Sequence, residues 1–251
     1  MALKNRLNLI KQQVEIDQKV KVSELSKLYQ VTEETIRRDL EKLEAEGFLT
    51  RTHGGAVLNV SMPRDNVHFL KRALVSQTEK KQIAVAAFDI LKQKRTIATD
   101  SSTTVMEAIK LLKDLETTIL TVSTEIFHEL IDTNLHIISS GGTFNKNTLS
   151  LHGQVAKDTI KKYNVDLAVL SCKCLDLEQG ATDTNENETE VKQCMINHAE
   201  RVALLVDHTK FGRRAFTHLI GFEDVDYIIT DREPSKEWMD VFKENNVIVI
   251  Y

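Results

Sequence analysis

The sequence has little of what would mark an exported or membrane protein. It contains three cysteines, an odd count that does not suit a disulfide framework, and its amphipathic N-terminus does not resemble a hydrophobic leader. No apolar run approaches the ~18 residues that a membrane-spanning helix needs. We therefore expect a protein of a reduced compartment, the cytoplasm, with no membrane partner.

A strong basic charge is also missing. The 251 residues carry 33 Lys+Arg and 37 Asp+Glu, a formal net charge of −4, which argues against a protein that coats nucleic acid. Residues 1–60 hold 10 basic and 9 acidic side chains, and the rest of the chain holds 23 and 28. Any affinity for DNA must therefore come from a few well-placed side chains.

Proline is scarce, with two residues, and the chain has neither an internal repeat nor a low-complexity tract. With 41% hydrophobic residues, the length suits one or two domains with ordinary cores. Pro63 lies in residues 59–75, where charges alternate without a clear period. We interpret this stretch as a linker, partly helical from Phe69 to Leu74, between domains at residues 1–58 and 76–251.

Residues 31–47, VTEETIRRDLEKLEAEG, have the features of a helix. Thr32 is a good N-cap residue, and acidic residues follow it in the first turn, where the helix dipole favours them. Apolar residues recur at i, i+4 and i+7, at Ile36, Leu40 and Leu43. Gly47 stands where a glycine would end the helix.

A shorter helix is predicted just upstream, in VSELSKLYQVT. It would be capped by Ser23, with Leu25 and Leu28 facing inward, and a tight turn would join it to the second helix. This is the helix-turn-helix pattern, whose second helix enters the DNA major groove. Arg37 and Arg38 face outward, where one can bind guanine and the other a phosphate. Solvated arginines are common on protein surfaces, so the helix pair alone does not establish that the domain binds DNA.

Both flanks of the helix pair favour a winged helix. RLNLIKQQVE, residues 6–15, predicts a third amphipathic helix with Leu7, Ile10 and Val14 in register. FLTRTHGGAVL, residues 48–58, alternates, turns at Gly54-Gly55 and returns as a second short strand. Arg51 and His53 would lie on this wing.

Beyond residue 75, strands and helices alternate. Ser76 and Glu79 form a capping-box pattern that opens a long helix. Near-continuous apolar strands, such as those at 96–99, 165–171 and 201–207, alternate with helices expected at 103–113, 150–163 and 188–200. This pattern predicts an α/β domain with a mostly parallel sheet covered on both faces.

Three strand-to-helix loops of this domain are rich in small hydroxyl residues and glycine. They are Asp100–Thr104, Ser123-Thr124 and Gly141-Gly142. Ligands of parallel sheets bind at such loops, where backbone N–H groups and helix dipoles suit an anion. Serine and threonine also cap helices without binding anything, so a phosphate site and plain capping both remain open at this point.

Residues 1–58 resemble the DNA-binding domain of the DeoR family of bacterial transcription regulators. The match is almost continuous over VSELSKLYQVTEETIRRDLEKLEAEGFLTRTHGGAVL, including TIRRDL and HGGA. The resemblance implies that this domain binds operator DNA. The residues that we expect to contact DNA are Ser23, Thr32, Glu33, Thr35, Arg37, Arg38, Lys42, Arg51 and His53.

Residues 76–250 resemble the sensor domain of the same family, which is similar in fold to ribose-phosphate isomerases. The matching stretches are IATDSSTTV, TVST, SSGGTFN, GATDTNENETEVKQCMI and LLVDHTKFGRRAF. Sensors of the family bind phosphorylated sugars or similar intermediates. The effector contacts implied here are Asp100, Ser102, Thr103, Thr104, Ser123, Thr124, Gly141, Gly142, Asp176, Glu188, Lys192 and Lys210.

The sequence departs from the family pattern in two places. Ser102 replaces a usual glycine in the first loop, and SCKCLD, residues 171–176, puts Lys173 and Cys174 where the family has small residues. Asp176 is kept. The resemblance therefore implies a sugar-phosphate pocket but leaves its shape, and the identity of the sugar, open.

The resemblance implies a repressor of sugar uptake or catabolism genes that a phosphorylated sugar releases from DNA, acting as a homodimer or higher homo-oligomer without a cofactor. The alternative is a sugar-phosphate isomerase-like enzyme fused to a DNA-binding module. Asp176, Glu188 and Lys210 could supply its base and cation. Because a DNA-binding domain is present, a sensor is the simpler use of the same pocket.

A metal site is a second alternative. Cys172 and Cys174 form a C-x-C pair, and Cys194 and His198 stand four residues apart, so four ligands are numerically present. Buried thiols on a strand and a helix explain the same residues without a metal. We expect no metal.

Overall fold

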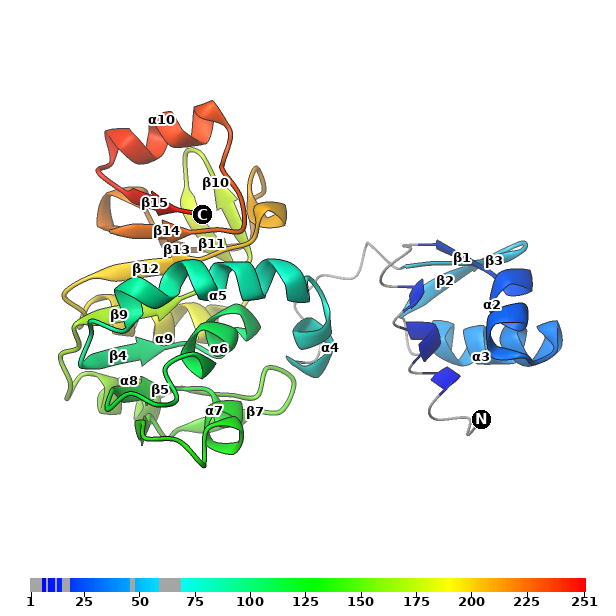
Figure 1. Ribbon diagram of the computed structural model, residues 1–251, viewed down its shortest axis with the longest axis horizontal. Helices are drawn as coiled ribbons and strands as arrows, with labels where there is room; N and C mark the ends of the chain where they lie inside the picture. The colour runs from blue at the N-terminus through cyan, green and yellow to red at the C-terminus, as the bar shows by residue number, and fades with distance from the viewer. Residues whose placement is uncertain (1–5, 8, 12, 15–18, 46–47, 59–68) are drawn as a thin grey trace. The chain divides into compact units, whose positions relative to one another are not determined.

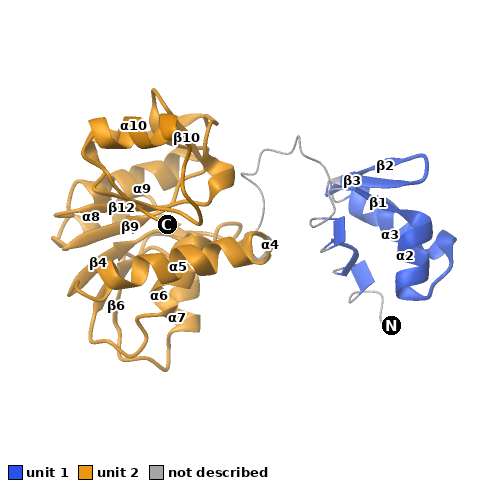
Figure 2. Cartoon of the chain, turned by 45° about the horizontal axis from the view of Figure 1, so that its top comes forward, with its two compact units in different colours: residues 1–66 blue, residues 67–251 orange. Residues whose placement is uncertain are grey.

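The computed structural model describes residues 6–7, 9–11, 13–14, 19–45, 48–58 and 69–251. The chain divides into two compact units, residues 1–66 and 67–251 (Figure 2). The first unit has one hydrophobic core cluster, and the second has two.

The smaller unit is a helix-turn-helix followed by a hairpin. Its elements are β1 (Lys19–Lys21), α2 (Val22–Tyr29), α3 (Glu33–Ala45), β2 (Leu49–Thr52) and β3 (Gly55–Leu58). Residues 6–7, 9–11 and 13–14 are also helical, and Ile10 and Val14 are fully buried against Ile36, Leu40 and Leu43. The predicted apolar stripes therefore form this core.

The unit differs from the prediction at its first helix. Strand β1, which was not predicted, leads directly into α2, so Lys21 is the N-cap residue and Ser23 lies inside the first turn without capping it. The buried stripe runs through Val22 and Leu25, and Leu28 lies outside it, 59% exposed. The predictions of Ser23 as a cap and Leu28 as a core residue were therefore wrong. Gly47 lies outside the described residues.

The hairpin turn lies one residue earlier than predicted. Thr52 pairs with Gly55, so His53 and Gly54 form the turn. Strand β3 also pairs with β1, giving a three-stranded antiparallel sheet in the order β1-β3-β2. A Cβ atom on Gly55 would lie 1.9 Å from the carbonyl oxygen of Val20, so only glycine permits this close approach.

The larger unit is built on a seven-stranded parallel sheet in the order β15-β14-β12-β9-β4-β5-β6 (Figure 1). Its strands are β4 (Thr96–Thr99), β5 (Thr118–Thr121), β6 (His136–Ser139), β9 (Leu167–Leu170), β12 (Val202–Leu205), β14 (Tyr227–Ile229) and β15 (Ile248–Ile250). The helices are α4 (Phe69–Leu74), α5 (Gln77–Leu91), α6 (Thr103–Lys110), α7 (Thr124–Glu129), α8 (Gln154–Ile160), α9 (Glu186–Ile196) and α10 (Lys236–Glu244), with 3-10 turns η2 (His208–Lys210) and η3 (Phe222–Asp224).

The strands of this sheet are buried on both faces. In β4, Ile97 packs in the cluster that contains α5 and α6, whereas Ala98 packs in the cluster that contains α8, α9 and α10. Strand β9 repeats the pattern with Leu167 and Ala168. Figure 2 shows α8, α9 and α10 on one side of the sheet and α5 and α6 on the other. The predicted parallel sheet with covered faces is confirmed.

Several short strands were missed. Strands β7 (Thr143–Asn145) and β8 (Ser150–His152) form a hairpin, and β10 (Cys174–Asp176), β11 (Gly180–Asp183) and β13 (Thr217–Ile220) form a small sheet. Because 150–152 belong to β8, the helix predicted at 150–163 begins only at Gln154. Ser76 has left-handed backbone angles (φ 52°) and makes no side-chain cap hydrogen bond, so the predicted capping box does not form.

The order of the strands creates a switch point between β4 and β9. From β4 the sheet continues through β5 and β6, and from β9 it continues the other way through β12, β14 and β15. The loops after β4 and β9 therefore leave in different directions at the carboxyl edge of the sheet, which is where such folds bind ligands.

Candidate functional sites

The face that is predicted to bind DNA is the exposed side of α3. Thr32 caps the helix, because its Oγ1 accepts a hydrogen bond from the backbone N–H of Thr35 at 3.3 Å. The side chains of Arg37 and Arg38 are 54% and 73% exposed. Arg37 forms an ion pair with Glu33 (2.8 Å), so this face carries its own counter-charge.

The wing is tied to α3 by Arg51. Its backbone N–H and its Nε both donate to the carboxylate of Glu44, at 2.8 and 2.9 Å. Lys42, His53 and Ser23 are exposed. All nine residues predicted to contact DNA are therefore exposed or half-buried, and their contacts with DNA stay predictions.

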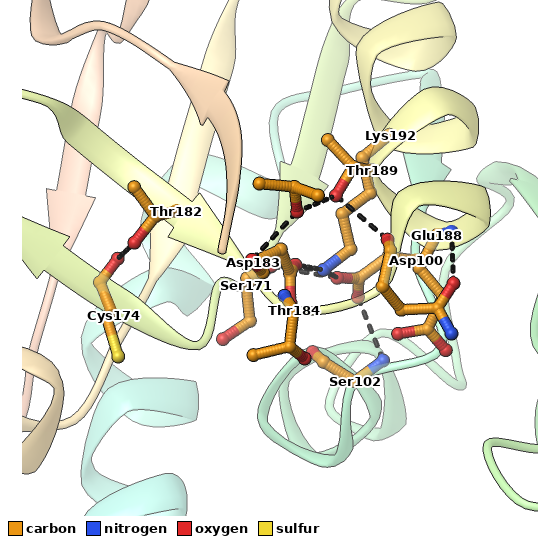
Figure 3. Close-up of polar contacts among 12 residues, drawn as sticks. Asp100, Ser102, Ser171, Cys174, Thr182, Asp183, Thr184, Glu188, Thr189 and Lys192 are labelled. Atoms are coloured by element: carbon orange, nitrogen blue, oxygen red, sulfur yellow. Dashed lines mark hydrogen bonds and ion pairs between the residues drawn. The ribbon is translucent and has the colours of Figure 1, made fainter. Parts of the chain in front are cut away.

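A buried ion-pair network organises the switch point of the larger unit (Figure 3). The ammonium of Lys192 donates to a carboxylate oxygen of Asp183 (2.6 Å) and to the carbonyl oxygen of Ser171 (2.7 Å), and it lies 3.2 Å from Asp100. Asp100 also accepts the backbone N–H groups of Ser102 (2.9 Å) and Ser171 (3.0 Å). One lysine thus joins the loops after β4 and β9 to α9.

The charges of this network are complementary. Burial on its own lowers the pKa of Lys192, but the carboxylates of Asp183 and Asp100 outweigh it and hold that pKa above its ordinary value. Three oxygen atoms, one each from Ser171, Asp183 and Asp100, lie within 3.2 Å of the ammonium. Lys192 and Asp100, which were predicted as effector contacts, are therefore positioned to hold the site together.

The loop after β4 offers unused hydrogen-bonding groups. Ser102 caps α6, its Oγ accepting from the backbone N–H of Val105 at 3.1 Å. Thr103 and Thr104 are only 6% and 4% exposed, yet their hydroxyls make no hydrogen bond with any residue that the structure describes. Two hydroxyls on largely buried residues at a helix N-terminus are suited to a bound anion.

Four side chains of the described region keep a buried polar atom without a partner. They are Arg72 (Nε and Nη2), Ser123 (Oγ), Thr184 (Oγ1) and Glu188 (Oε1). An unpaired buried polar group costs about 1–3 kcal/mol, so such atoms mark places where a ligand can supply the partner. Ser123 and Glu188 were predicted effector contacts, and Figure 3 shows Thr184 and Glu188 around the Asp100 network.

A group of cations faces the same region. Burial, together with the charges of Arg72 and Lys210, lowers the pKa of Lys173 to about 8. Burial, together with the charges of Lys210 and Arg72, also lowers the pKa of Lys80 to about 8, and its ammonium donates to the carbonyl oxygens of Arg72 and Val75. The ammonium groups of Lys173 and Lys210 make no hydrogen bond or ion pair with a described residue.

Sequence reasoning did not single out Arg72 or Lys80. Arg72 lies in the stretch that was interpreted as a linker, and Lys80 lies in a helix whose lysines gave no distinguishing signal. The basic pair in FLKRAL was the only available hint of Arg72.

Two predicted effector contacts have other partners. Asp176 accepts backbone N–H groups in the β10–β11 turn, and its bond with Arg214 (2.9 Å) lowers the pKa of Asp176 to about 2. Thr124 donates both its N–H and its hydroxyl to the carbonyl of Leu149. The bonds of Asp176 and Thr124 hold the fold in place.

The glycine loop serves the β7–β8 hairpin. Gly141 and Gly142 have φ angles of 62° and 110°. A Cβ atom on Gly142 would lie 2.5 Å from the carbonyl oxygen of His152, so the hairpin packs directly on this glycine.

Cys172 and Cys194 are buried, and Cys174 is half-buried. Burial raises the pKa of Cys172 to about 12, and the thiol of Cys194 lies 3.6 Å from the carbonyl oxygen of Lys157. His198 contacts the carbonyl oxygen of Cys194 through Nδ1. Within the described ranges, no three or more His, Cys, Asp or Glu side chains are grouped to hold a metal ion, and no helix there is long and apolar enough to cross a membrane.

Both units match known families. The family model of the DeoR-like helix-turn-helix domain matches residues 6–62, and that of the DeoR C terminal sensor domain matches residues 75–232. The chain is 39% identical to the uncharacterized HTH-type transcriptional regulator YulB of Bacillus subtilis, covering 92% of this chain and 90% of the relative.

Two further relatives have names that state a function. The L-fucose operon activator of Haemophilus influenzae is 29% identical, over 98% of this chain and 98% of the relative. The HTH-type transcriptional repressor GlcR of Bacillus subtilis is 30% identical, over 91% of this chain and 88% of the relative. Both an activator and a repressor thus share this architecture.

Proposed function

Because this chain belongs to the DeoR family of helix-turn-helix transcriptional regulators, we propose that it represses genes of sugar uptake or catabolism and leaves its operator when a phosphorylated sugar binds. The observation that carries this proposal is the set of buried, unpaired polar atoms on Arg72, Ser123, Thr184 and Glu188 of the larger unit. A site of this kind is unfavourable when empty and favourable when an anion with hydroxyl groups fills it.

The charges support a phosphate group in particular. Arg72, Lys173 and Lys210 have cationic groups without a counter-ion among the described residues, and Glu188 is the carboxylate there that has an unpaired buried oxygen. Among these four groups the positive charges exceed the negative charge by two, which a phosphate dianion would neutralise. Charge-assisted hydrogen bonds of this type are about twice as strong as neutral ones.

The remaining groups suit a sugar. The Glu188 carboxylate can accept a hydrogen bond from a sugar hydroxyl, and the hydroxyls of Ser123 and Thr184 can donate or accept. The pocket would therefore bind the phosphate through the cations and the N-terminus of α6. It would bind the sugar through Glu188, Ser123 and Thr184.

On the DNA side, a homodimer would bind two half-sites about one helical turn, or a multiple of it, apart. The larger unit would supply the dimer contact, because the apolar side chains of the smaller unit are largely used in its own core. For this chain the proposal is repression, as the name of GlcR states for that relative, and not activation, as the name of the L-fucose operon activator states. Footprinting of the operator with and without the effector tests the spacing of the half-sites and the release of the protein from DNA.

We do not propose catalysis. The three relatives are named as regulators, and Asp176, one of the groups that an isomerase would need, is engaged with Arg214 and its own turn. Incubating the protein with pentose and hexose phosphates tests this. Turnover above that of a Lys210→Ala control would favour the enzyme.

A phosphorylated sugar should stabilise the protein against heat, and its unphosphorylated parent should not. Stabilisation follows RT ln(1 + [L]/Kd), so a ligand at 100 times its Kd adds about 2.7 kcal/mol, which is visible as a rise in Tm. A thermal-shift screen of the full chain against paired sugars and sugar phosphates makes the measurement.

The same screen can be extended to a variant. Thr104→Ala should bind operator normally but respond weakly to the sugar phosphate, because a hydroxyl without a protein partner at the α6 N-terminus is lost. Equal shifts with free and phosphorylated sugar, or a normal response of Thr104→Ala, would contradict the proposal.

A further inference from the structure

The apolar stripe of α3 is interrupted by one charged side chain. Ile36, Leu40 and Leu43 are buried in the core of the smaller unit, and Asp39 lies among them with 1% of its surface exposed. Among the residues of α3, all of which the structure describes, Asp39 is the one charged residue that is buried. A buried carboxylate is costly unless it is paired, so this core depends on the partner of Asp39.

The partner of Asp39 is Arg6, which lies 33 residues earlier in the chain. The Nε of Arg6 donates a hydrogen bond to Oδ2 of Asp39 at 2.6 Å, and Arg6 is itself only 8% exposed. Arg6 belongs to the helical residues before β1, where Ile10 and Val14 enter the same core as the apolar stripe of α3. The ion pair therefore joins this first helical segment to the middle of α3.

The pair is placed directly beside the side chains that are predicted to contact DNA. Arg37 and Arg38 precede Asp39 in the sequence, and both are exposed. Their ion pairs are with glutamates of α3 itself, so these pairs cannot fix where the helix lies in the unit. The hydrogen bond from Arg6 reaches α3 from another segment and can fix its position.

Stability alone does not explain a charged pair at this place. The desolvation of two charges can exceed their attraction, and apolar side chains of similar volume are often as good or better in stability. Apolar contacts are also non-directional, whereas a hydrogen bond requires its donor and acceptor at a defined distance and angle. The pair can therefore define the rotation of α3 about its axis more sharply than apolar packing would.

We propose that Arg6 and Asp39 are positioning residues for operator recognition, which set the rotation of α3 so that Arg37 and Arg38 reach a base edge and a phosphate. A rotation of the helix that displaced Asp39 would displace both arginines with it. Bidentate hydrogen bonds with a base edge depend on geometry, so they tolerate little displacement. The proposal rests on the proposed DNA-binding function and adds to it two residues that do not themselves contact DNA.

The test compares a single variant of the full chain with a double variant. Arg6→Met should lower the stability of the smaller unit, because it leaves the carboxylate of Asp39 buried and unpaired. Arg6→Met combined with Asp39→Leu replaces the pair with apolar side chains and should restore that stability or exceed it. Hydrogen exchange of the α3 amides reports the stability of this unit within the full chain.

DNA binding separates positioning from structural support. The specific probe is a duplex that the unchanged protein selects from a random-sequence pool, and the non-specific probe is a scrambled duplex of the same length and composition. In the double variant, affinity for the selected duplex should fall roughly tenfold or more, the loss expected when one arginine–base contact is misaligned. Affinity for the scrambled duplex should change by less than about twofold, because it depends on phosphate contacts. Gel shifts at one salt concentration measure both affinities.

Two controls separate the loss of position from the loss of stability and of charge. Val14→Ala truncates a fully buried side chain of the first helical segment, so it should lower the protection of the α3 amides and leave the ion pair in place. Well below its unfolding temperature, it should bind the selected duplex like the unchanged protein. Lys161→Met combined with Asp158→Leu removes an exposed ion pair of the larger unit and should change neither stability nor DNA binding.

The comparison of the double variant with Val14→Ala decides the proposal. If the double variant regains the protection of α3 and binds both duplexes like the unchanged protein, the pair is a structural contact only and the proposal is overturned. If the double variant regains only part of this protection, Val14→Ala is the reference, and an equal loss of specific affinity in both variants also overturns the proposal. If the unchanged protein selects no sequence from the pool, the proposed DNA-binding function itself fails, and the positioning role fails with it.

Discussion

Replacing Arg37 and Arg38 together with alanine should abolish specific operator binding. Each arginine can contribute ~1–3 kcal/mol of binding free energy if it forms bidentate hydrogen bonds with a base edge. Together the losses would weaken binding by roughly 30-fold to more than 10,000-fold at fixed salt. A gel shift with the operator, at one salt concentration, measures the effect.

The double variant should remain folded. Both side chains are more than half exposed, and their partners in the structure are Glu33 and Glu34 of the same helix. Such exposed pairs contribute only about 0.3–0.5 kcal/mol each. Arg95→Ala, in the larger unit, is the matched control and should bind DNA normally. Near-native affinity in the double variant would show that α3 does not read the operator.

The second large effect is expected at Lys192. Lys192→Met should destabilise the larger unit by ~3–5 kcal/mol, because it leaves the buried carboxylates of Asp100 and Asp183 without their shared cation. In a unit of this size the loss corresponds to a fall in Tm of roughly 10 °C. Thermal unfolding followed by circular dichroism makes the measurement.

A double-mutant cycle isolates the electrostatic cause. Adding Asp183→Asn to Lys192→Met removes one of the two uncompensated charges and should recover part of the lost stability. Lys161→Met is the surface control, because Lys161 pairs with Asp158 at 3.6 Å in an exposed position and should change Tm little. If Lys192→Met melted within about 2 °C of the unchanged protein, the network would not hold the switch point.

Much of the structure of the smaller unit could be predicted from the sequence, because the residues that specify its helices lie close together in the chain. The stripe of Ile36, Leu40 and Leu43 needs only helical periodicity, and Thr32 caps α3 through a neighbour three residues away. Where a distant strand intervened, the prediction failed. Strand β1 leads directly into α2 and pairs with β3, and the helix therefore starts before Ser23 can cap it.

In the larger unit the sequence by itself determined the parallel sheet, because continuous apolar strands are compatible only with burial on both faces. It also marked the loops at the carboxyl edge, which contain Asp100, Thr103 and Thr104. The three- and four-residue strands β7, β8, β10, β11 and β13 were missed. They are too short for a period to be read, and their pairing partners decide them.

Only the tertiary structure decided which side chains meet. Asp100 and Ser171 are joined by a hydrogen bond across 71 residues, and Lys192 meets both only because β4 and β9 are neighbours at the switch point. For the same reason, the sequence did not indicate Arg72 as a residue of the candidate site. Its stretch has no period, and Lys173 and Lys210, whose charges are felt in the same region, lie more than one hundred residues away in the sequence, so that no local pattern could connect them with Arg72.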